Sequence, residues 1–354
     1  MFAYIGCYTD RPGACGKGIS VYEVAGPERA WTLLQLLDTP PNPGCLAIDA
    51  RQAFLYACHG DIAAVSAYRI DRHTGKLSFL NLQPTGGDNA PHLTIDAAGR
   101  HLIVAHGPGI AVFPISPDGS LVPYSAAMVP PGTPGPYRRE QAHGAHPHQV
   151  VFDPSGNFLV APDKGVDSVH VYRLDGATGK LVPHHPPAVK CRYGAGPRHI
   201  AFHPGGALAY VVNELDSTIA TYRWDARHGT LEPLQILPST PATFTGDNTA
   251  SEVAVARSGR SVYVSNRGHD SIATFSVNEA SGTLSPAGWV STNGRTPRFF
   301  ALEPGNDLMY VANEASNSIV ALRVDQVTGE LTFAGQVADT GTPTCIVFGH
   351  DGWV

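Results

Sequence analysis

The amino-acid sequence predicts an all-β fold: a seven-bladed β-propeller closed by pairing of the N- and C-terminal strands in one blade. Three observations lead to this prediction. A segment with a period of about 50 residues recurs along the chain, and each copy holds four short strand-like runs separated by turns. Both ends of the chain supply parts of one further copy. The copies open at Pro43, Ala90, Pro147, Pro197, Ala250, Pro297 and Pro343.

The copy that opens at Pro197 shows how one blade is encoded. Its first run alternates polar and apolar residues and is followed by Pro-Gly-Gly, which predicts a strand and a turn. The second run is rich in Val and Tyr, as strands are. A turn that starts at Asp225 and contains Gly229 precedes the last run, because Asp caps its own backbone and Gly allows a positive φ. The four expected strands are 198–203, 208–213, 217–224 and 231–237.

The two ends of the chain complete each other. The copy that opens at Pro343 stops after its first strand. Residues 2–8 match a second strand, and residues 18–24 match a third. We therefore expect a blade built from both termini, with the C-terminal strand innermost, which leaves no free strand edge in the ring. The seven copies use the whole chain, so residues 1–354 are expected to form a single domain.

The composition excludes some classes of partner. The chain is 43% hydrophobic and 15% charged, as soluble globular proteins are, and its net charge of −6 offers no basic stripe for nucleic acid or membranes. It starts directly in a strand-like run and has no apolar run of transmembrane length. We expect a cytoplasmic protein, monomeric or a small homo-oligomer, with no nucleic-acid or membrane partner. The six cysteines lack C-x-x-C spacing, and those in apolar runs, such as Cys45, are expected to be free thiols.

Positions where the copies differ point to a functional site. The first two strands of a blade are antiparallel, so the start of the first and the end of the second lie at the same mouth of the central channel. When the seven copies are aligned, the position that starts the first strand is occupied by Gly44, Pro91, His148, Arg198, Ser251, Arg298 and Thr344. The next position is occupied by Cys45, His92, Gln149, His199, Glu252, Phe299 and Cys345. The end of the second strand is Tyr8, Gly60, Gly107, Lys164, Glu214, Arg267 and Glu314.

A scaffold alone does not need His148, Arg198, Glu214 and Arg267 on three consecutive blades at one mouth. Solvated rim charges are the alternative for each residue taken singly, but the four together favour a site. The aligned position just before the end of the second strand is mostly Asn, Asp or His, and we interpret this column as architectural. It comprises Cys7, His59, His106, Asp163, Asn213, Asn266 and Asn313.

Four segments resemble the propeller lactonase family, which includes bacterial 6-phosphogluconolactonase and the fungal 3-carboxy-cis,cis-muconate lactonizing enzyme. These segments are His146-Pro-His-Gln-Val-Val-Phe-Asp-Pro, Gly194-Ala-Gly-Pro-Arg-His-Ile-Ala-Phe-His-Pro, Tyr210-Val-Val-Asn-Glu-Leu and Tyr263-Val-Ser-Asn-Arg. The resemblance covers essentially the whole chain. It implies a catalytic site made of His148, Arg198, Glu214 and Arg267, and no metal or other cofactor.

These residue types suit the opening of a lactone by water. Histidine has an ordinary pKa of about 6.5, so His148 fits a proton-transfer role, while Glu214 is an alternative base or orients an Arg or His. Guanidinium groups bind phosphate or carboxylate through paired hydrogen bonds, and one of them could also stabilise the oxyanion. The candidate substrate-binding residues are Arg198, Arg267, His199, Arg298, Lys164 and His143.

The segment 137–148 enters the same mouth and carries Arg138, Arg139, His143 and His146. These side chains are candidates for a phosphate clamp or, alternatively, are solvated loop charges. The spacing of its histidines matches no standard zinc pattern and no fourth ligand is recognisable, so no metal is expected.

We therefore predict a carboxylic ester hydrolase of carbohydrate metabolism, similar to 6-phosphogluconolactonase of the pentose phosphate pathway, whose partner is a small anionic lactone. Two alternatives stay open. One is a lactonase or cycloisomerase that acts on a carboxylated lactone, such as a muconolactone or a sugar-acid lactone. The other is a non-catalytic propeller that binds a peptide or protein, for which exposed aromatic or apolar residues at one mouth would be expected instead of Arg, His and Glu.

Overall fold

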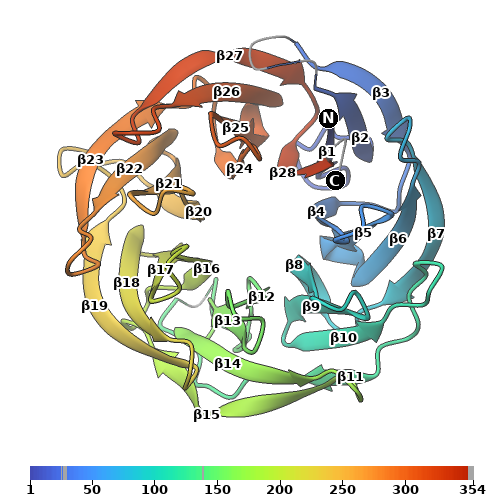
Figure 1. Cartoon of the computed structure of the whole chain (residues 1–354), viewed down its shortest axis with the longest axis horizontal. Coiled ribbons are helices and arrows are strands. Elements are labelled where there is room, and N and C mark those ends of the chain that lie inside the picture. The colour runs from blue at the N-terminus through green and yellow to red at the C-terminus, as the bar shows by residue number, and fades with distance from the viewer. Residues whose placement is uncertain (25, 27–29, 138, 350–354) are drawn as a thin grey trace.

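Seven four-stranded antiparallel sheets surround a central axis and form a closed ring (Figure 1). The structure is a computed structural model that describes residues 1–24, 26, 30–137 and 139–349. The predicted seven-bladed β-propeller is confirmed. We number the blades in chain order from the first complete one, so that blade 7 contains both termini.

The first strand of each of blades 1 to 6 lies nearest the axis, and the chain then runs outwards. Blade 1 contains β4 (Pro43–Ile48), β5 (Phe54–His59), β6 (Ala64–Ile70) and β7 (Leu77–Pro84). Blade 2 contains β8 (Asp88–Ile95), β9 (His101–Gly107), β10 (Ile110–Pro114) and β11 (Ala126–Met128). Blade 3 contains β12 (Val151–Phe152), β13 (Leu159–Asp163), β14 (Ser168–Asp175) and β15 (Lys180–Lys190).

The remaining blades follow the same plan. Blade 4 contains β16 (Pro197–Phe202), β17 (Leu208–Asn213), β18 (Thr218–Asp225) and β19 (Thr230–Pro238). Blade 5 contains β20 (Thr249–Val255), β21 (Ser261–Arg267), β22 (Ser271–Val277) and β23 (Leu284–Ser291). Blade 6 contains β24 (Pro297–Leu302), β25 (Leu308–Asn313), β26 (Ser318–Val324) and β27 (Leu331–Asp339). Short 3-10 helices η1 (Gly60–Ile62) and η2 (Glu314–Ser316) follow β5 and β25.

Blade 7 closes the ring as predicted. It contains β28 (Pro343–Gly349), β1 (Phe2–Cys7), β2 (Ile19–Glu23) and β3 (Thr32–Leu37). β28 is innermost and pairs with β1 in a register that runs from Phe2 opposite Gly349 to Cys7 opposite Pro343. The closure of the ring therefore depends on hydrogen bonds between strands at opposite ends of the sequence.

Buried tyrosines of the second strands connect neighbouring blades. Tyr56 of β5 donates its hydroxyl hydrogen to the carbonyl of Gly119, at 3.1 Å, in the turn between β10 and β11 of the next blade. Tyr263 of β21 does the same to Gly329, at 3.0 Å, in the turn between β26 and β27. Both glycines have positive φ values, 89° and 75°, which they adopt without strain. The repeated Tyr and Gly positions therefore set the spacing between blades.

The turns that begin with Asp form as predicted. The Oδ1 atom of Asp225 accepts the N–H groups of Arg227 and His228, at 2.9 and 3.0 Å, and Gly229 has a φ of 62°. The architectural column also behaves as predicted where its side chains bind the backbone beside strand ends: Asn266 and Asn313 donate to the carbonyls of Ser239 and Thr292. These residues hold the loops around the channel mouth.

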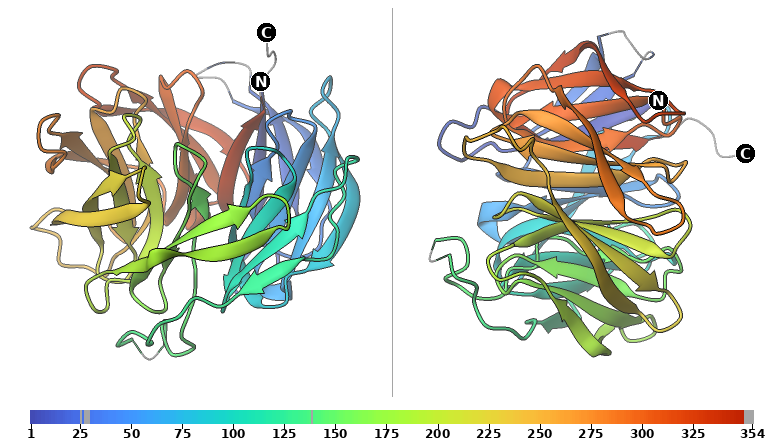
Figure 2. Two further views of the ribbon diagram at one scale, coloured as in Figure 1. Left: turned by 60° about the horizontal axis from the view of Figure 1, so that its bottom comes forward. Right: turned by 90° about the vertical axis from the view of Figure 1, so that its left-hand side faces the viewer.

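The connection between β11 and β12 extends beyond one face of the disc (Figure 2).

No helix in the described part of the chain is long and apolar enough to cross a membrane.

We predict that the strand from the C-terminal end contributes strongly to stability. Ile346 of β28 is buried between blades, so Ile346→Ala is expected to lower the free energy of unfolding by about 2–5 kcal/mol. Leu36→Ala on the exposed outer strand β3 is the control and should change it by about 0.5 kcal/mol or less. Denaturant titration of both variants measures the difference, and equal effects would contradict this account of closure.

Candidate active site at the channel mouth

A cavity of about 190 Å³ lies where the predicted columns converge. Of the described residues, every blade except blade 5 contributes to its lining. The lining comprises Tyr8, Arg11, Gly44, Cys45, Gly60, Asn89, Ala90, Pro91, His92, His148, Lys164, Arg198, His199, Glu214, Arg298, Phe299, Thr344 and Cys345. Blade 5 instead supplies Ser251, Glu252 and Arg267, which contact the lining residues Arg198, His199 and Glu214.

Irregular pairing at the start of the innermost strands explains why two successive residues face the cavity. In a regular strand, neighbouring side chains point to opposite faces. In blade 4, however, Pro197 lies opposite Asn213 and His199 opposite Val212, so Arg198 is an extra residue in the ladder. A β-bulge of this kind redirects a side chain, and both Arg198 and His199 line the cavity. Blades 1 and 6 show the same shift, at Gly44 and Arg298.

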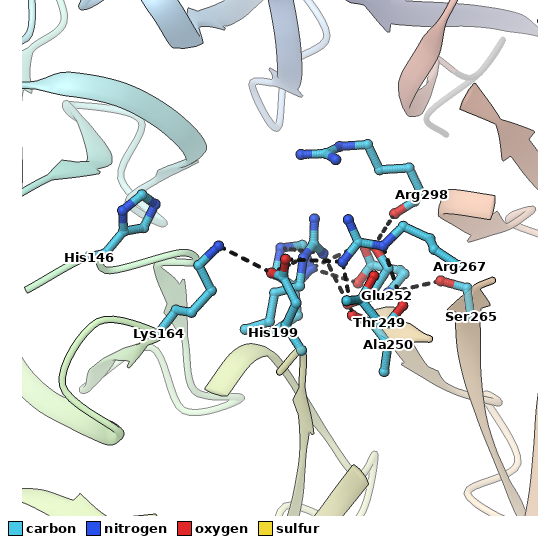
Figure 3. Close-up of polar contacts among 12 residues, drawn as sticks. His146, Lys164, His199, Thr249, Ala250, Glu252, Ser265, Arg267 and Arg298 are labelled. Carbon is cyan, nitrogen blue, oxygen red and sulfur yellow. Dashed lines mark hydrogen bonds and ion pairs between the residues drawn. The ribbon is translucent and has the colours of Figure 1, made fainter. Parts of the chain in front are cut away.

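The carboxylate of Glu214 lies within ion-pair distance of three cations, of which Lys164 and Arg267 are labelled in Figure 3. Its Oε1 is 3.2 Å from Nη2 of Arg267, and its Oε2 is 3.3 Å from Nε of Arg198 and 3.5 Å from Nζ of Lys164. Lys164 and Arg267 approach from opposite sides, from blades 3 and 5. Three positive charges thus share one negative charge in a largely buried place.

The pKa values reflect this imbalance. Burial alone would raise the pKa of Glu214, but Arg267, Lys164 and Arg198 outweigh it and hold that pKa well below its usual range. Burial and the charge of Arg267 lower the pKa of Arg198 to about 9 despite Glu214. Burial also lowers the pKa of Lys164. The site is therefore short of negative charge, which an anionic ligand can supply.

Arg267 takes a different position from the other cations. Its Nε and Nη2 atoms also donate to the carbonyls of Thr249 and Ala250, at 3.4 and 3.2 Å, and it is not among the described residues that line the cavity. In this structure Arg267 forms an ion pair with Glu214 from outside the cavity. The predicted direct contact of Arg267 with substrate stays a prediction.

His148 lies in the wall of the cavity, in the loop before β12. Its imidazole is buried, and Nδ1 has no hydrogen-bond partner among the described residues. Burial, followed by the charge of Arg198, lowers its pKa well below the usual value, so the ring is neutral at neutral pH. Its ring centroid is 5.2 Å from that of His199. A neutral, unpaired imidazole in a cationic cavity is a base available for proton transfer.

His199 connects the cation cluster to a buried carboxyl that sequence reasoning did not single out. Its Nε2 is 3.2 Å from Nη1 of Arg198, and its Nδ1 is 2.9 and 3.0 Å from the two oxygens of Glu252 (Figure 3). Because Arg198 can only donate, Nε2 accepts, and Nδ1 carries the proton that it donates to Glu252. Burial raises the pKa of Glu252 to about 7. Glu252 therefore fixes the tautomer of His199, which in turn orients Arg198.

Arg298 enters the cavity from blade 6, with its guanidinium directed towards the channel axis (Figure 3). Its Nη1 donates to Oε2 of Glu314 at 3.3 Å, and its Cζ lies 5.1 Å from the centroid of the Tyr8 ring. Burial opposes its charge, but Tyr8, Glu314 and Glu214 raise its pKa. It is thus a permanent cation at the predicted substrate-binding position.

The candidate side chains of the long loop before β12, for which a phosphate clamp and solvated charges were the alternatives, do not line the cavity where the structure describes them. His146 is half-buried, and its Nε2 lies 3.4 Å from the amide of Asn89, while burial lowers its pKa to about 4. His143 and Arg139 are exposed and are not among the described cavity residues. Arg138 lies outside the described residues. Over the described ranges, no group of three or more His, Cys, Asp or Glu side chains is arranged to hold a metal ion.

Comparison with known proteins agrees with this architecture. Residues 2–348 match the family model described as "Lactonase, 7-bladed beta-propeller". The chain is 34% identical to the 6-phosphogluconolactonase of Bacillus subtilis (strain 168) over 85% of this chain and 84% of that one. It is 30% identical to the 6-phosphogluconolactonase of Formosa agariphila over 86% and 87%. The solved structure of a periplasmic gluconolactonase from Pseudomonas aeruginosa superposes with a TM-score of 0.89 at 29% identity, covering 98% of both chains.

The chain belongs to the seven-bladed β-propeller lactonase family. The predictions of family, fold and enzyme class are therefore confirmed: the protein is a lactone-hydrolysing enzyme. Its propeller lactonase cavity contains the predicted residues His148, Arg198, Glu214, Lys164, His199 and Arg298. The cytoplasmic location and the oligomeric state stay predictions.

Glu252 gives a test of the buried pair in this lactonase. Its pKa is about 7 in the folded protein but about 4.3 in an unfolded chain, so folding favours its protonated form. The resulting stabilisation is complete below about pH 4 and is lost as the pH rises through 7. We expect Glu252→Gln, which cannot ionise, to gain stability relative to the native protein between about pH 5 and pH 8.

Unfolding by denaturant at several pH values in that range measures this difference. Glu232→Gln, which removes an exposed carboxylate on strand β19, is the matched control and should change the free energy of unfolding by about 0.5 kcal/mol or less. A difference for Glu252→Gln that does not change with pH would contradict the titration of this carboxyl in the folded state.

Proposed function

We propose that this lactonase hydrolyses an anionic sugar lactone, that 6-phosphogluconolactone is its substrate, and that His148 is the base. The observation that carries the proposal is the Glu214 cluster. Three cations share one carboxylate there, beside the neutral and unpaired imidazole of His148. Two positive charges without a counter-charge favour a ligand with a phosphate, and they also favour a transition state in which a carbonyl oxygen becomes negative.

The relatives support the choice of substrate. The proteins of Bacillus subtilis and Formosa agariphila carry the name 6-phosphogluconolactonase, and that of Pseudomonas aeruginosa is called a gluconolactonase. These names agree on a gluconolactone ring and differ in the phosphate. A phosphorylated substrate would put this enzyme in the pentose phosphate pathway.

His148 is a better candidate for the base than Glu214. Glu214 is bound on both oxygens by cations that hold its pKa far below its usual range, which makes it a weak proton acceptor. The pKa of His148 is lowered mainly by burial and then by the charges of Arg198, His199 and Lys164. An anionic substrate neutralises the arginine and lysine charges, so its binding raises the pKa of His148 towards the range in which a base works well.

The proposed reaction begins when His148 takes a proton from water as the water oxygen attacks the lactone carbonyl carbon. Arg198 stabilises the oxyanion of the tetrahedral intermediate, because Glu214 and His199 hold its guanidinium in the cavity. The bond between the carbonyl carbon and the ring oxygen then breaks. His148 returns its proton to the ring oxygen, which becomes a hydroxyl, and the new carboxylic acid ionises.

A carboxylated lactone is the competing substrate class. It would use the same cations but would supply only a single negative charge, which leaves part of the positive charge at Glu214 unbalanced. The third interpretation, a non-catalytic binding module, is disfavoured because the cavity wall is formed by Arg, Lys, His and Glu side chains and the chain belongs to a family of enzymes. Assays with phosphorylated, unphosphorylated and carboxylated lactones separate these possibilities.

Substitution of the proposed base should remove most of the catalysed rate. We expect His148→Ala to lower kcat for 6-phosphogluconolactone by about 10²- to 10⁴-fold, the usual contribution of a positioned acid or base. Glu214→Gln should act mainly on KM, because Lys164 and Arg198 lose the charge that holds them in place. The rates are measured with purified protein after subtraction of spontaneous hydrolysis.

His184→Ala provides the matched control, since His184 lies on the outer strand β15 and packs on Phe158 away from the cavity. It should leave kcat unchanged. If His148→Ala and Glu214→Gln both retained full rates, the assignment of the site would be wrong.

A further inference from the structure

Two guanidinium groups lie on the Tyr8 ring on the other side of the cavity from His148. Cζ of Arg11 is 3.8 Å from the ring centroid, and Cζ of Arg298 is 5.1 Å from it. Tyr8 follows β1 in blade 7 and Arg298 belongs to blade 6, and these blades stand across the ring from blade 3, which carries His148 (Figure 1). All four residues line the same cavity.

We propose that Arg11 and Arg298, arranged on Tyr8, form a subsite for the phosphate group of a phosphorylated lactone, and that Arg11 makes the enzyme prefer phosphorylated over unphosphorylated substrates. The inference rests on the proposed function and specifies which end of the substrate each wall of the cavity binds. Arg11 lies in the loop between β1 and β2, outside the repeated columns of the sequence.

Arg11 is held rigidly although its loop is partly exposed. Its Nε and Nη2 atoms donate to the two carboxylate oxygens of Asp61, at 2.6 and 2.8 Å. Asp61 in turn accepts from the side-chain amide of Asn42 at 2.8 Å. The Oδ1 atom of buried Asn42 accepts the backbone N–H groups of Thr9 and Asp10, at 2.8 and 2.9 Å. The loop of blade 7 is thereby fixed to blade 1, and Arg11 needs little ordering when a ligand binds.

Both guanidiniums keep donors available for a ligand. Asp61 occupies the Nε and Nη2 edge of Arg11, and Glu314 occupies only Nη1 of Arg298. Neither Nη1 of Arg11 nor Nη2 of Arg298 makes a further hydrogen bond to a described residue. Burial and the nearby charge of Arg298 both act to lower the pKa of Arg11, and the effect of Arg298 is the repulsion expected between two like charges at close range. An anion bound by both would relieve this repulsion.

Two glycines keep this wall open. A Cβ atom on Gly44 would lie 3.2 Å from Cε1 of Tyr8, and one on Gly60 would lie 3.3 Å from Nη2 of Arg11. Both distances are shorter than ordinary van der Waals contact, so a side chain at either position would press on Tyr8 or Arg11. The absence of side chains therefore preserves access to the two guanidiniums.

A phosphate monoester fits this wall better than a neutral hydroxymethyl group or a single carboxylate. It carries a charge of about −1.5 to −2 at pH 7 and three terminal oxygens that accept hydrogen bonds. In a 6-phosphorylated lactone the phosphate hangs from the carbon attached to the ring carbon that bears the leaving oxygen. With the lactone carbonyl beside His148 and Arg198, the phosphate can extend to the opposite wall, where two guanidiniums present separate donors.

The test compares two substrates on each variant. The kcat/KM values for 6-phosphogluconolactone and for glucono-δ-lactone are measured with the native protein, Arg11→Gln and Arg298→Gln. We expect the ratio of the phosphorylated to the unphosphorylated value to fall by about 10- to 100-fold for Arg11→Gln, mainly through KM, as expected for loss of a charge-assisted hydrogen bond. Inorganic phosphate should inhibit hydrolysis of glucono-δ-lactone competitively in the native protein and much less in Arg11→Gln.

Arg173→Gln is the matched control, because Arg173 also lies on an aromatic ring, 4.2 Å from the centroid of Phe158, but on the outside of blade 3. It should leave the ratio unchanged. A ratio that stays constant in both Arg11→Gln and Arg298→Gln overturns the subsite, even if both variants are slower.

Failure of the proposed function gives a different result, namely a native protein that hydrolyses neither lactone above background. Calorimetric titration with inorganic phosphate then still decides the inference. Binding that is lost in Arg11→Gln supports the subsite, and binding that is equal in both proteins contradicts it.

Discussion

The ion cluster around Glu214 is the interaction on which the site depends. Its carboxylate is contacted by cations from blades 3, 4 and 5, all within 3.5 Å. Without it, Lys164, Arg198 and Arg267 would be like charges confined to a partly desolvated space, where their mutual repulsion is strong. A buried carboxylate surrounded in this way is costly to bring out of water, and close contacts on both of its oxygens offset that cost. The cluster therefore requires the three blades to be in register.

That register comes from the propeller itself. Interblade contacts such as Tyr263 to Gly329 fix how far one blade stands from the next, and pairing of β28 with β1 closes the ring. The β-bulges at the start of the innermost strands then turn two successive side chains towards the axis. One strand thus delivers both Arg198 and His199 to the cavity. The repeated scaffold fixes the backbone at the start of each innermost strand. A functional site then requires only a change of side chain at these positions.

Much of the site could be predicted from the sequence for this reason. Aligned repeats place residues at equivalent points in space, so the repeats alone assign His148, Arg198, Glu214, Lys164 and Arg298 to one mouth, and all five line the cavity. The direction in which a long side chain extends is not part of the repeat. Arg267 stands in the expected column, but its guanidinium turns back to the carbonyls of Thr249 and Ala250.

Other members of the site carried weaker signals. Glu252 stood in an aligned column, but its role depends on a contact with His199 that only the packing of blades 4 and 5 reveals. Arg11 lies in a loop specific to blade 7, so no comparison of repeats could find it. Loop conformation also determines which histidines are exposed. His143 is exposed, whereas His146 in the same loop is half-buried beside Asn89. Such segments lack the strand ladder that fixes position elsewhere.

In the proposed complex, one cavity binds the two ends of the substrate on opposite walls, with the reacting group on the Glu214 side and the phosphate on the Tyr8 side. A crystal structure of the protein with bound 6-phosphogluconate, the product of the proposed reaction, would show whether the two ends are bound in this way. We expect the product carboxylate within hydrogen-bond reach of Arg198 and His148, and the phosphate in contact with Arg11 and Arg298. A phosphate bound to Lys164 and Arg198, with the carboxylate near Tyr8, would contradict it.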